Sequence, residues 1–158
     1  MKSLVYESDK SIYLRVGSVD LPEKVDPKMV QLGRITQRKF GEKYAIITSG
    51  PSMAKIALEV ARAESENEIA VFTYPTPKRH FNLEDMKLIS NFEKVLVIEN
   101  HLPSPGIFSQ LLEHFQSSDA KVKLIRSGIS ELPRNGQTQE VLEHHGMDVD
   151  SLAKAFRN

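Results

Sequence analysis

Three side chains able to do chemistry follow one another at residues 99–101. Glu99, Asn100 and His101 come directly after the apolar run 95–98 and precede a Pro/Gly turn. A carboxylate and an imidazole can exchange protons or share a metal ion, but a metal site needs more ligands than this segment offers. The alternative, which we favour on the residues alone, is that Glu99 and His101 hydrogen-bond a loop or lie at a subunit interface.

A second candidate is the segment TSGPS at residues 48–52. Ser49, Gly50 and Ser52 bring small side chains and backbone N–H groups to the expected start of a helix, which suits an anion. The segment lacks the lysine of a P-loop and the glycine spacing of a dinucleotide-binding turn. The alternative is an ordinary strand-to-helix turn capped by serine.

Arg15, near the end of an early strand-like segment, is a further candidate for a substrate or interface contact. The histidines at 114, 144 and 145 lie in expected helices, where a single histidine usually has a surface or structural role. Cysteine is absent, so disulfides and thiolate chemistry are excluded. No Ser-His-Asp order or nucleophile elbow is present, and we predict no metal site.

Strand-like and helix-like segments alternate through most of the chain and must position these residues. The continuous apolar run 44–48 is typical of a strand buried on both faces of a sheet, and the segments 68–74, 94–100 and 120–128 are expected to be further strands. Helices are expected between these runs, with Asn82 as one N-cap and Gly146 as the break between two short C-terminal helices, the second capped by Asp148 or Asp150. This alternation predicts a three-layer α/β fold with helices on both faces of the sheet.

Two earlier segments, 11–17 and 31–40, also have strand-like composition. The turn at 41–43 predicts that 31–40 pairs with 44–48 as an antiparallel hairpin. We therefore expect a mixed five-stranded sheet with four parallel strands and one antiparallel strand. Ligands of such sheets bind outside the carboxyl ends of the strands, where both candidate segments would lie.

The charges balance, with 21 Lys and Arg residues against 21 Asp and Glu residues. A chain without net charge has no field to attract nucleic acid or an acidic membrane. The first residues lack the apolar core of a signal peptide, and no apolar run reaches the length of a membrane span. We expect a soluble, cytoplasmic protein with neither nucleic acid nor membrane as a partner.

The order of these segments resembles the C-terminal domain of the transketolase family. The resemblance rests on the segments SIYLRVG, LGRITQRKFGEKYAIITSGPSMAKIALEVA, IAVFTYPTPKRHF and NFEKVLVIENHLPSPGIFSQLLEHF, and on Gly136, Glu140, Val141, Leu142, His145, Gly146 and Met147 in the tail. It implies a C-terminal domain at 31–158, preceded at 1–30 by a linker and a remnant of the pyrimidine-binding domain, as if the chain were cut there. Two positions depart from the family pattern: only Gly106 remains of the glycine-rich turn, and Ser18 stands where many members have an arginine.

The resemblance implies a role in an enzyme that uses thiamine diphosphate and magnesium to transfer two-carbon ketol units between sugars. In that family two preceding domains hold the cofactor, so this chain alone is expected to have no catalytic residue, bind no cofactor and be inactive. Its partners would be those domains, or a subunit that carries them, in a homo-oligomer such as a dimer. Alternatives are a free-standing module that binds a small molecule or anion, and a regulatory interaction subunit.

Overall fold

The structure, a computed structural model, describes residues 11, 13, 25–64, 67–75, 81–102, 106–132 and 135–157. The predicted strand at 11–17, the candidate Arg15 and most of the segment 1–30 lie outside these residues.

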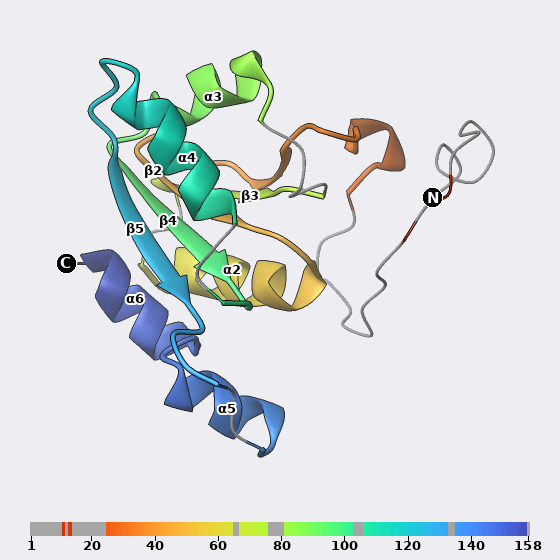
Figure 1. The fold of residues 1–158 in the computed structure, drawn as a ribbon, viewed down its shortest axis with the longest axis vertical. Helices are drawn as coiled ribbons and strands as arrows, with labels where there is room; N and C mark the ends of the chain where they lie inside the picture. Colours follow the sequence, from red (N-terminus) through yellow and green to blue (C-terminus); the bar gives the residue numbers. More distant parts are fainter. Residues whose placement is uncertain are drawn as a thin grey trace.

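A five-stranded sheet in the order β1-β3-β2-β4-β5 forms the centre of the fold (Figure 1). Its strands are β1 (Thr36–Lys39), β2 (Tyr44–Thr48), β3 (Ile69–Thr73), β4 (Lys94–Glu99) and β5 (Lys123–Gly128). The last four run parallel, and β1 runs antiparallel to β3. The predicted mixed sheet with one antiparallel strand is confirmed.

The predicted hairpin between 31–40 and 44–48 is wrong, because β1 pairs with β3 and β3 lies between β1 and β2. The chain instead crosses the start of β3 at Gly41, where a Cβ atom would overlap the backbone of Ile69 and Ala70. The reason is burial. β2 is apolar on both faces and gains most between two parallel neighbours, whereas β1, with the sequence TQRK, suits an edge.

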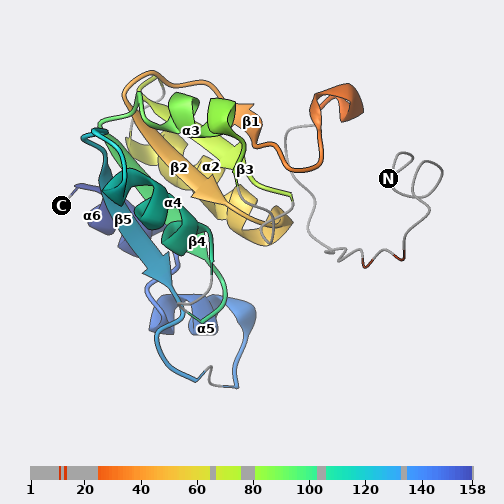
Figure 2. The same cartoon turned by 45° about the horizontal axis from the view of Figure 1, so that its top comes forward.

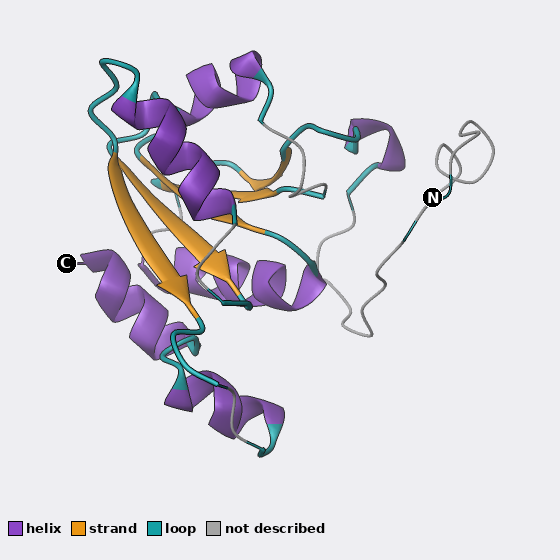
Figure 3. Cartoon of the chain, viewed as in Figure 1, coloured by secondary structure: helices purple, strands orange, loops and turns teal. Residues whose placement is uncertain are grey.

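Helices cover both faces of the sheet, as predicted (Figures 2 and 3). They are α2 (Pro51–Glu64), α3 (Leu83–Ile89), α4 (Ile107–Gln116), α5 (Thr138–His144) and α6 (Val149–Arg157), with a 3₁₀ turn, η1 (Pro27–Met29), before the sheet. One apolar core lies between the sheet and α3 and α4, and a second between the sheet and α2 and α6. The shorter helix α5 lies beyond the carboxyl end of β5 (Figure 1).

Local capping fixes the ends of several helices. The Asn82 side chain accepts the Glu84 N–H at 2.8 Å, so the predicted cap of α3 is confirmed. Gly146, with φ of 62°, ends α5 as predicted. Of the two candidate caps for α6, Asp148 takes the role by accepting the Ser151 N–H at 3.0 Å.

No helix in the described part of the chain combines the length and the apolar character that crossing a membrane requires.

Candidate functional site

The two candidate segments meet where the connections of two neighbouring strands leave toward opposite faces of the sheet. β2 leads into α2 on one face, and the neighbouring β4 leads into α4 on the other. Thr48 and Ile98 are paired in register, and the Thr48 hydroxyl donates to the Ile98 carbonyl at 2.7 Å. Adjacent parallel strands whose connections leave in opposite directions form the usual ligand crevice of α/β proteins. We call this edge the rim.

Glu99 is the last residue of β4, and its side chain is fully buried. One carboxylate oxygen, Oε1, accepts the backbone N–H of Ile107, the first residue of α4. The N-cap of α4 is Gly106, which has no side chain to do this, and a Cβ atom there would overlap the Glu99 carboxylate. Glu99 therefore caps α4 from the neighbouring strand, and its negative charge is stabilised by the positive end of the helix.

Two cationic or polar side chains face the same carboxylate. His101 Nε2 lies 3.4 Å from Glu99 Oε1, and Arg126 Nε lies 3.9 Å from Glu99 Oε2. Arg126 comes from β5, and its guanidinium lies 5.5 Å from the centre of the Phe108 ring. Glu99 Oε2 and Arg126 Nη2 are both buried and make no hydrogen bond within the described residues. Glu99 and Arg126 therefore attract each other electrostatically, and each keeps a polar atom that can form a further hydrogen bond.

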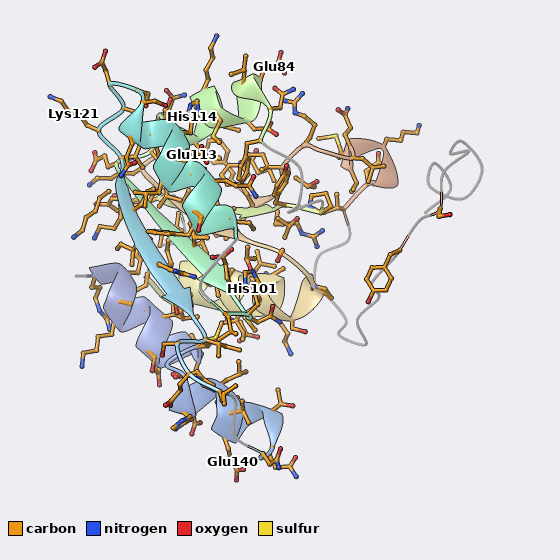
Figure 4. The ribbon with its side chains drawn as sticks, viewed as in Figure 1. Glu84, His101, Glu113, His114, Lys121 and Glu140 are labelled. Atoms are coloured by element: carbon orange, nitrogen blue, oxygen red, sulfur yellow. The ribbon has the colours of Figure 1, made fainter. Side chains whose placement is uncertain are left out.

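His101 is the exposed member of the group, with 41% of its side chain accessible. Its Nδ1 lies 2.7 Å from the Leu102 carbonyl oxygen, so the loop and Glu99 together orient the ring. Asn100 is exposed beside it. Figure 4 places His101 at the end of β4, at the opposite end of α4 from His114. The structure thus brings Glu99, Asn100 and His101 together: Glu99 is buried, Asn100 is exposed, and the partly accessible His101 contacts Glu99.

The segment 48–52 forms a tight turn into α2. Gly50 has φ of 78°, a left-handed conformation that favours glycine. Helix α2 begins at Pro51, which has no N–H to offer a ligand. The proposed contribution of Ser49, Gly50 and Ser52 to an anion site remains a prediction.

Neither helix start at the rim fits the diphosphate group of thiamine diphosphate. The first N–H of α4 is already bound by the Glu99 carboxylate, and a diphosphate at that helix end would lie against this buried negative charge. The other helix end at the rim starts with Pro51 and offers fewer free N–H groups. No cofactor chemistry is assigned to these residues.

Sequence reasoning missed Arg126 and the role of Gly106. Arg126 is paired in register with Val97 on the neighbouring strand, which puts the two side chains on the same face of the sheet. The available signal was an arginine directly after the apolar pair Leu124 and Ile125, but its partner could be identified only once the register of β4 and β5 was known.

Comparison with known proteins identifies transketolase-type relatives, although no protein-family model matches the sequence. The chain is 27% identical over 146 residues to a subunit of the apulose-4-phosphate transketolase of Actinobacillus succinogenes, covering 89% of this chain and 47% of that protein. It is 28% identical over 147 residues to the 1-deoxy-D-xylulose-5-phosphate synthase of Bacteroides thetaiotaomicron, covering 90% and 22% respectively. The chain therefore spans less than half the length of these relatives.

Solved structures agree on the fold. A split-gene transketolase in an inactive tetramer matches with a TM-score of 0.74 and 23% identity, over 87% of this chain and 46% of that chain. The transketolase of Campylobacter jejuni matches with a TM-score of 0.55 and 18% identity, over 87% and 20%. Together with the sequence relatives, these matches confirm the predicted resemblance to the C-terminal domain of transketolases.

Proposed function

We propose that this transketolase-like domain is the C-terminal assembly part of a thiamine diphosphate-dependent enzyme that transfers two-carbon ketol units between sugars. The observation that carries the proposal is the position of Glu99. This carboxylate is fully buried and bound to the first N–H of α4. In this arrangement the Glu99 carboxylate stabilises the start of α4 at the rim. We therefore assign the chemical step to the part of the enzyme that carries the cofactor.

The partner in this proposal carries the cofactor-binding domains of the same enzyme. One relative is named as a transketolase subunit, and this chain covers 47% of it. A domain that matches part of a longer enzyme or one of its subunits needs the remaining part for a complete active site. His101 and Asn100, both accessible at the rim, are then available for contacts across that boundary.

A surface for this partner lies around the edge strand β1. Met29 and Leu32 precede this strand in the sequence and Phe40 follows it, and their side chains are 68%, 46% and 66% exposed. Among the described strands, β1 lies at the end of the sheet order, next to β3. Exposed apolar side chains near the edge of a sheet are typical of an interface. We call Met29, Leu32 and Phe40 the β1 edge surface.

Calorimetric titration of thiamine diphosphate with Mg²⁺ tests the proposal. We expect no binding to the chain alone. With a separately produced protein that carries the two cofactor-binding domains, we expect a complex, cofactor binding, and ketol transfer from a ketose phosphate to an aldose phosphate. Cofactor binding by the chain alone would place the site on this domain and overturn the assignment, and failure to form the complex would overturn the assembly role.

A pair of matched variants tests the β1 edge surface. Phe40→Asp introduces a charge at the proposed interface, whereas Leu112→Asp makes the same change at a 40% exposed position on α4. We expect Phe40→Asp to weaken partner binding at least about tenfold, the usual effect at an interface anchor. Equal affinities for the two variants would remove this surface from the proposal.

A further inference from the structure

We infer that Glu131, His144 and His145 form a binding site for a divalent transition-metal ion, with Zn²⁺ as the best match. The three side chains each offer one ligand atom, and these atoms all lie within 4.8 Å of one another. The inference departs from the sequence-based expectation of no metal site, and it does not depend on the proposed function.

The three residues converge from two segments. Glu131 lies in the connection that follows β5, whereas His144 is the last residue of α5 and His145 follows it. His144 Nε2 lies 2.8 Å from Glu131 Oε1, across 13 residues of sequence. The rings of His144 and His145 have centroids 5.0 Å apart and planes at 72°. Two imidazoles and one carboxylate therefore share a small volume.

His145 provides the second observation that points to a ligand. Its Nε2 is buried and makes no hydrogen bond within the described residues. Buried polar side-chain atoms are nearly always hydrogen-bonded, and one without a partner calls for an explanation such as an ion. Coordination to a metal ion would give this imidazole its missing partner.

The backbone holds the two histidines in a defined turn. The Gly146 N–H donates to the Glu143 carbonyl at 3.0 Å, and the Met147 N–H donates to the Leu142 carbonyl at 2.8 Å. This pair of bonds, with Gly146 at positive φ, is the Schellman ending of a helix. Met147 is 1% exposed and anchors the turn in the core. The backbone of both histidines is thus fixed before any ion arrives, and the carbonyl end of α5 favours a cation.

The ligand types select the class of ion. Two imidazole nitrogens and one carboxylate oxygen form a set that Zn²⁺ accepts, with water in the fourth position. Mg²⁺ and Ca²⁺ prefer ligand sets made of oxygen alone. Tetrahedral Zn²⁺ with bonds of about 2.0 Å keeps its ligand atoms about 3.3 Å apart. Because all separations are within 4.8 Å, the more distant ligand atoms need to close in by about 1.5 Å at most, whereas His144 Nε2 and Glu131 Oε1, 2.8 Å apart, need to separate by about 0.5 Å. Side-chain rotation can provide both movements.

Titration of the metal-free, untagged chain with ZnCl₂ tests the inference. We expect one Zn²⁺ to bind per chain. Co²⁺ bound in its place should give the visible absorption bands of a four-coordinate site. Glu131→Gln, His144→Ala and His145→Ala should each weaken Zn²⁺ binding at least about tenfold. His114→Ala removes a histidine from α4, outside the cluster, and should leave the affinity unchanged.

Histidine ring resonances in NMR spectra provide a readout that does not depend on how well a variant folds. In the unmodified chain, Zn²⁺ should shift the ring nitrogens of His144 and His145 and leave those of His114 in place. Absence of saturable Zn²⁺ binding would overturn the inference. So would binding that survives in the His144→Ala/His145→Ala double variant, or ring shifts spread equally over all the histidines.

Discussion

Glu99 connects three elements through one buried carboxylate. It ends β4, binds the first N–H of α4, and lies 3.9 Å from the Arg126 guanidinium of β5. An isolated charge would be costly in this environment, so the contacts of this carboxylate matter to the stability of the fold. The residue that looks most catalytic in the sequence is therefore explained by the structure it stabilises.

Removing the Glu99 carboxylate should destabilise the fold. Glu99→Ala leaves the Ile107 N–H and the Arg126 guanidinium without their partner, and we expect the free energy of unfolding to fall by about 2–4 kcal/mol. Glu99→Gln keeps an oxygen acceptor and should cost less. Urea denaturation at pH 7 measures both. Glu113→Gln on the exposed face of α4 is the control, within about 0.5 kcal/mol of wild type, and equal values for all three variants would contradict the capping role.

Gly106 should be coupled to Glu99. A Cβ atom at residue 106 would overlap the Glu99 carboxylate, so we expect Gly106→Ala to cost about 1–3 kcal/mol. In the Glu99→Ala background that overlap is gone, and the same substitution should cost less. A double-mutant cycle measured by denaturation gives the coupling energy, expected to exceed about 0.5 kcal/mol. Strict additivity would show that the two residues do not constrain each other.

Asp148 gives the stability of the last helix a defined dependence on pH. Burial raises the pKa of its carboxyl, but hydrogen bonds from the Ser151 side chain and backbone outweigh burial and leave the pKa below the usual 3.8. A pKa lowered by folding adds stability that is complete above 3.8 and is lost as the pH falls through the folded value. Asp148→Ala should therefore cost about 1 kcal/mol at pH 7, the usual value for an N-cap.

The control for Asp148 is Asn, which keeps the capping oxygen without the charge. We expect Asp148→Asn to lie between wild type and Asp148→Ala at pH 7. Urea denaturation repeated at about pH 3 should narrow the gap between wild type and Asp148→Asn, because the wild-type carboxyl begins to protonate there. If the difference in unfolding free energy between wild type and Asp148→Asn increased at low pH, the predicted direction of the Asp148 pKa shift would be wrong.

At the scale of elements, the sequence was sufficient for the parallel part of the sheet and insufficient for its edge. Continuous apolar runs and helix caps predicted β2, β3, β4 and the helices between the strands, because burial on both faces leaves a clear pattern. β5 is only partly buried, and its segment has a weaker apolar pattern. The partner of β1 depends on which strands compete for the centre of the sheet. That competition involves residues far apart in the sequence, so the short turn at 41–43 cannot predict its outcome.

The candidate site divides in the same way. Glu99 and His101 are neighbours in the sequence, so their proximity was predictable. Arg126 reaches Glu99 only through the register of β4 and β5, which the composition of either strand does not specify. Glu131 meets His144 only through the path of the connection after β5. Sequence spacing therefore predicts local pairs, and the fold supplies the third member of each cluster.

Gly41 tests the crossing that replaced the predicted hairpin. In a hairpin this residue would lie in an exposed turn, and alanine would be tolerated. In the structure a Cβ atom would overlap the backbone of Ala70, so we expect Gly41→Ala to lower the free energy of unfolding by about 1–3 kcal/mol. Thermal and urea denaturation measure the change. Glu42→Ala, at the exposed neighbouring residue, is the control, and equal stability of the two variants would contradict the crossing.

At the scale of the whole molecule, the two edges of the sheet differ. β5 contacts α6 and α4, which shield its faces, whereas β1 is flanked by the exposed apolar side chains of Met29, Leu32 and Phe40. The formal net charge is +0, so no overall repulsion opposes contact between copies of the chain. Exposed apolar side chains can pack against a second copy of the chain when the proposed partner is absent.

The isolated chain should therefore form homo-oligomers through the β1 edge surface. Sedimentation velocity over a wide range of concentrations should show a monomer that converts to a dimer or larger species as the concentration rises. Phe40→Asp should raise the dissociation constant at least about tenfold, because it replaces an exposed apolar side chain of the proposed contact with a charge, whereas Leu112→Asp should not. If the partner protein occupies the same surface, adding it should dissociate the homo-oligomer. A chain that stays monomeric at high concentration would exclude self-association, and an oligomer unaffected by Phe40→Asp would assign the contact to another face.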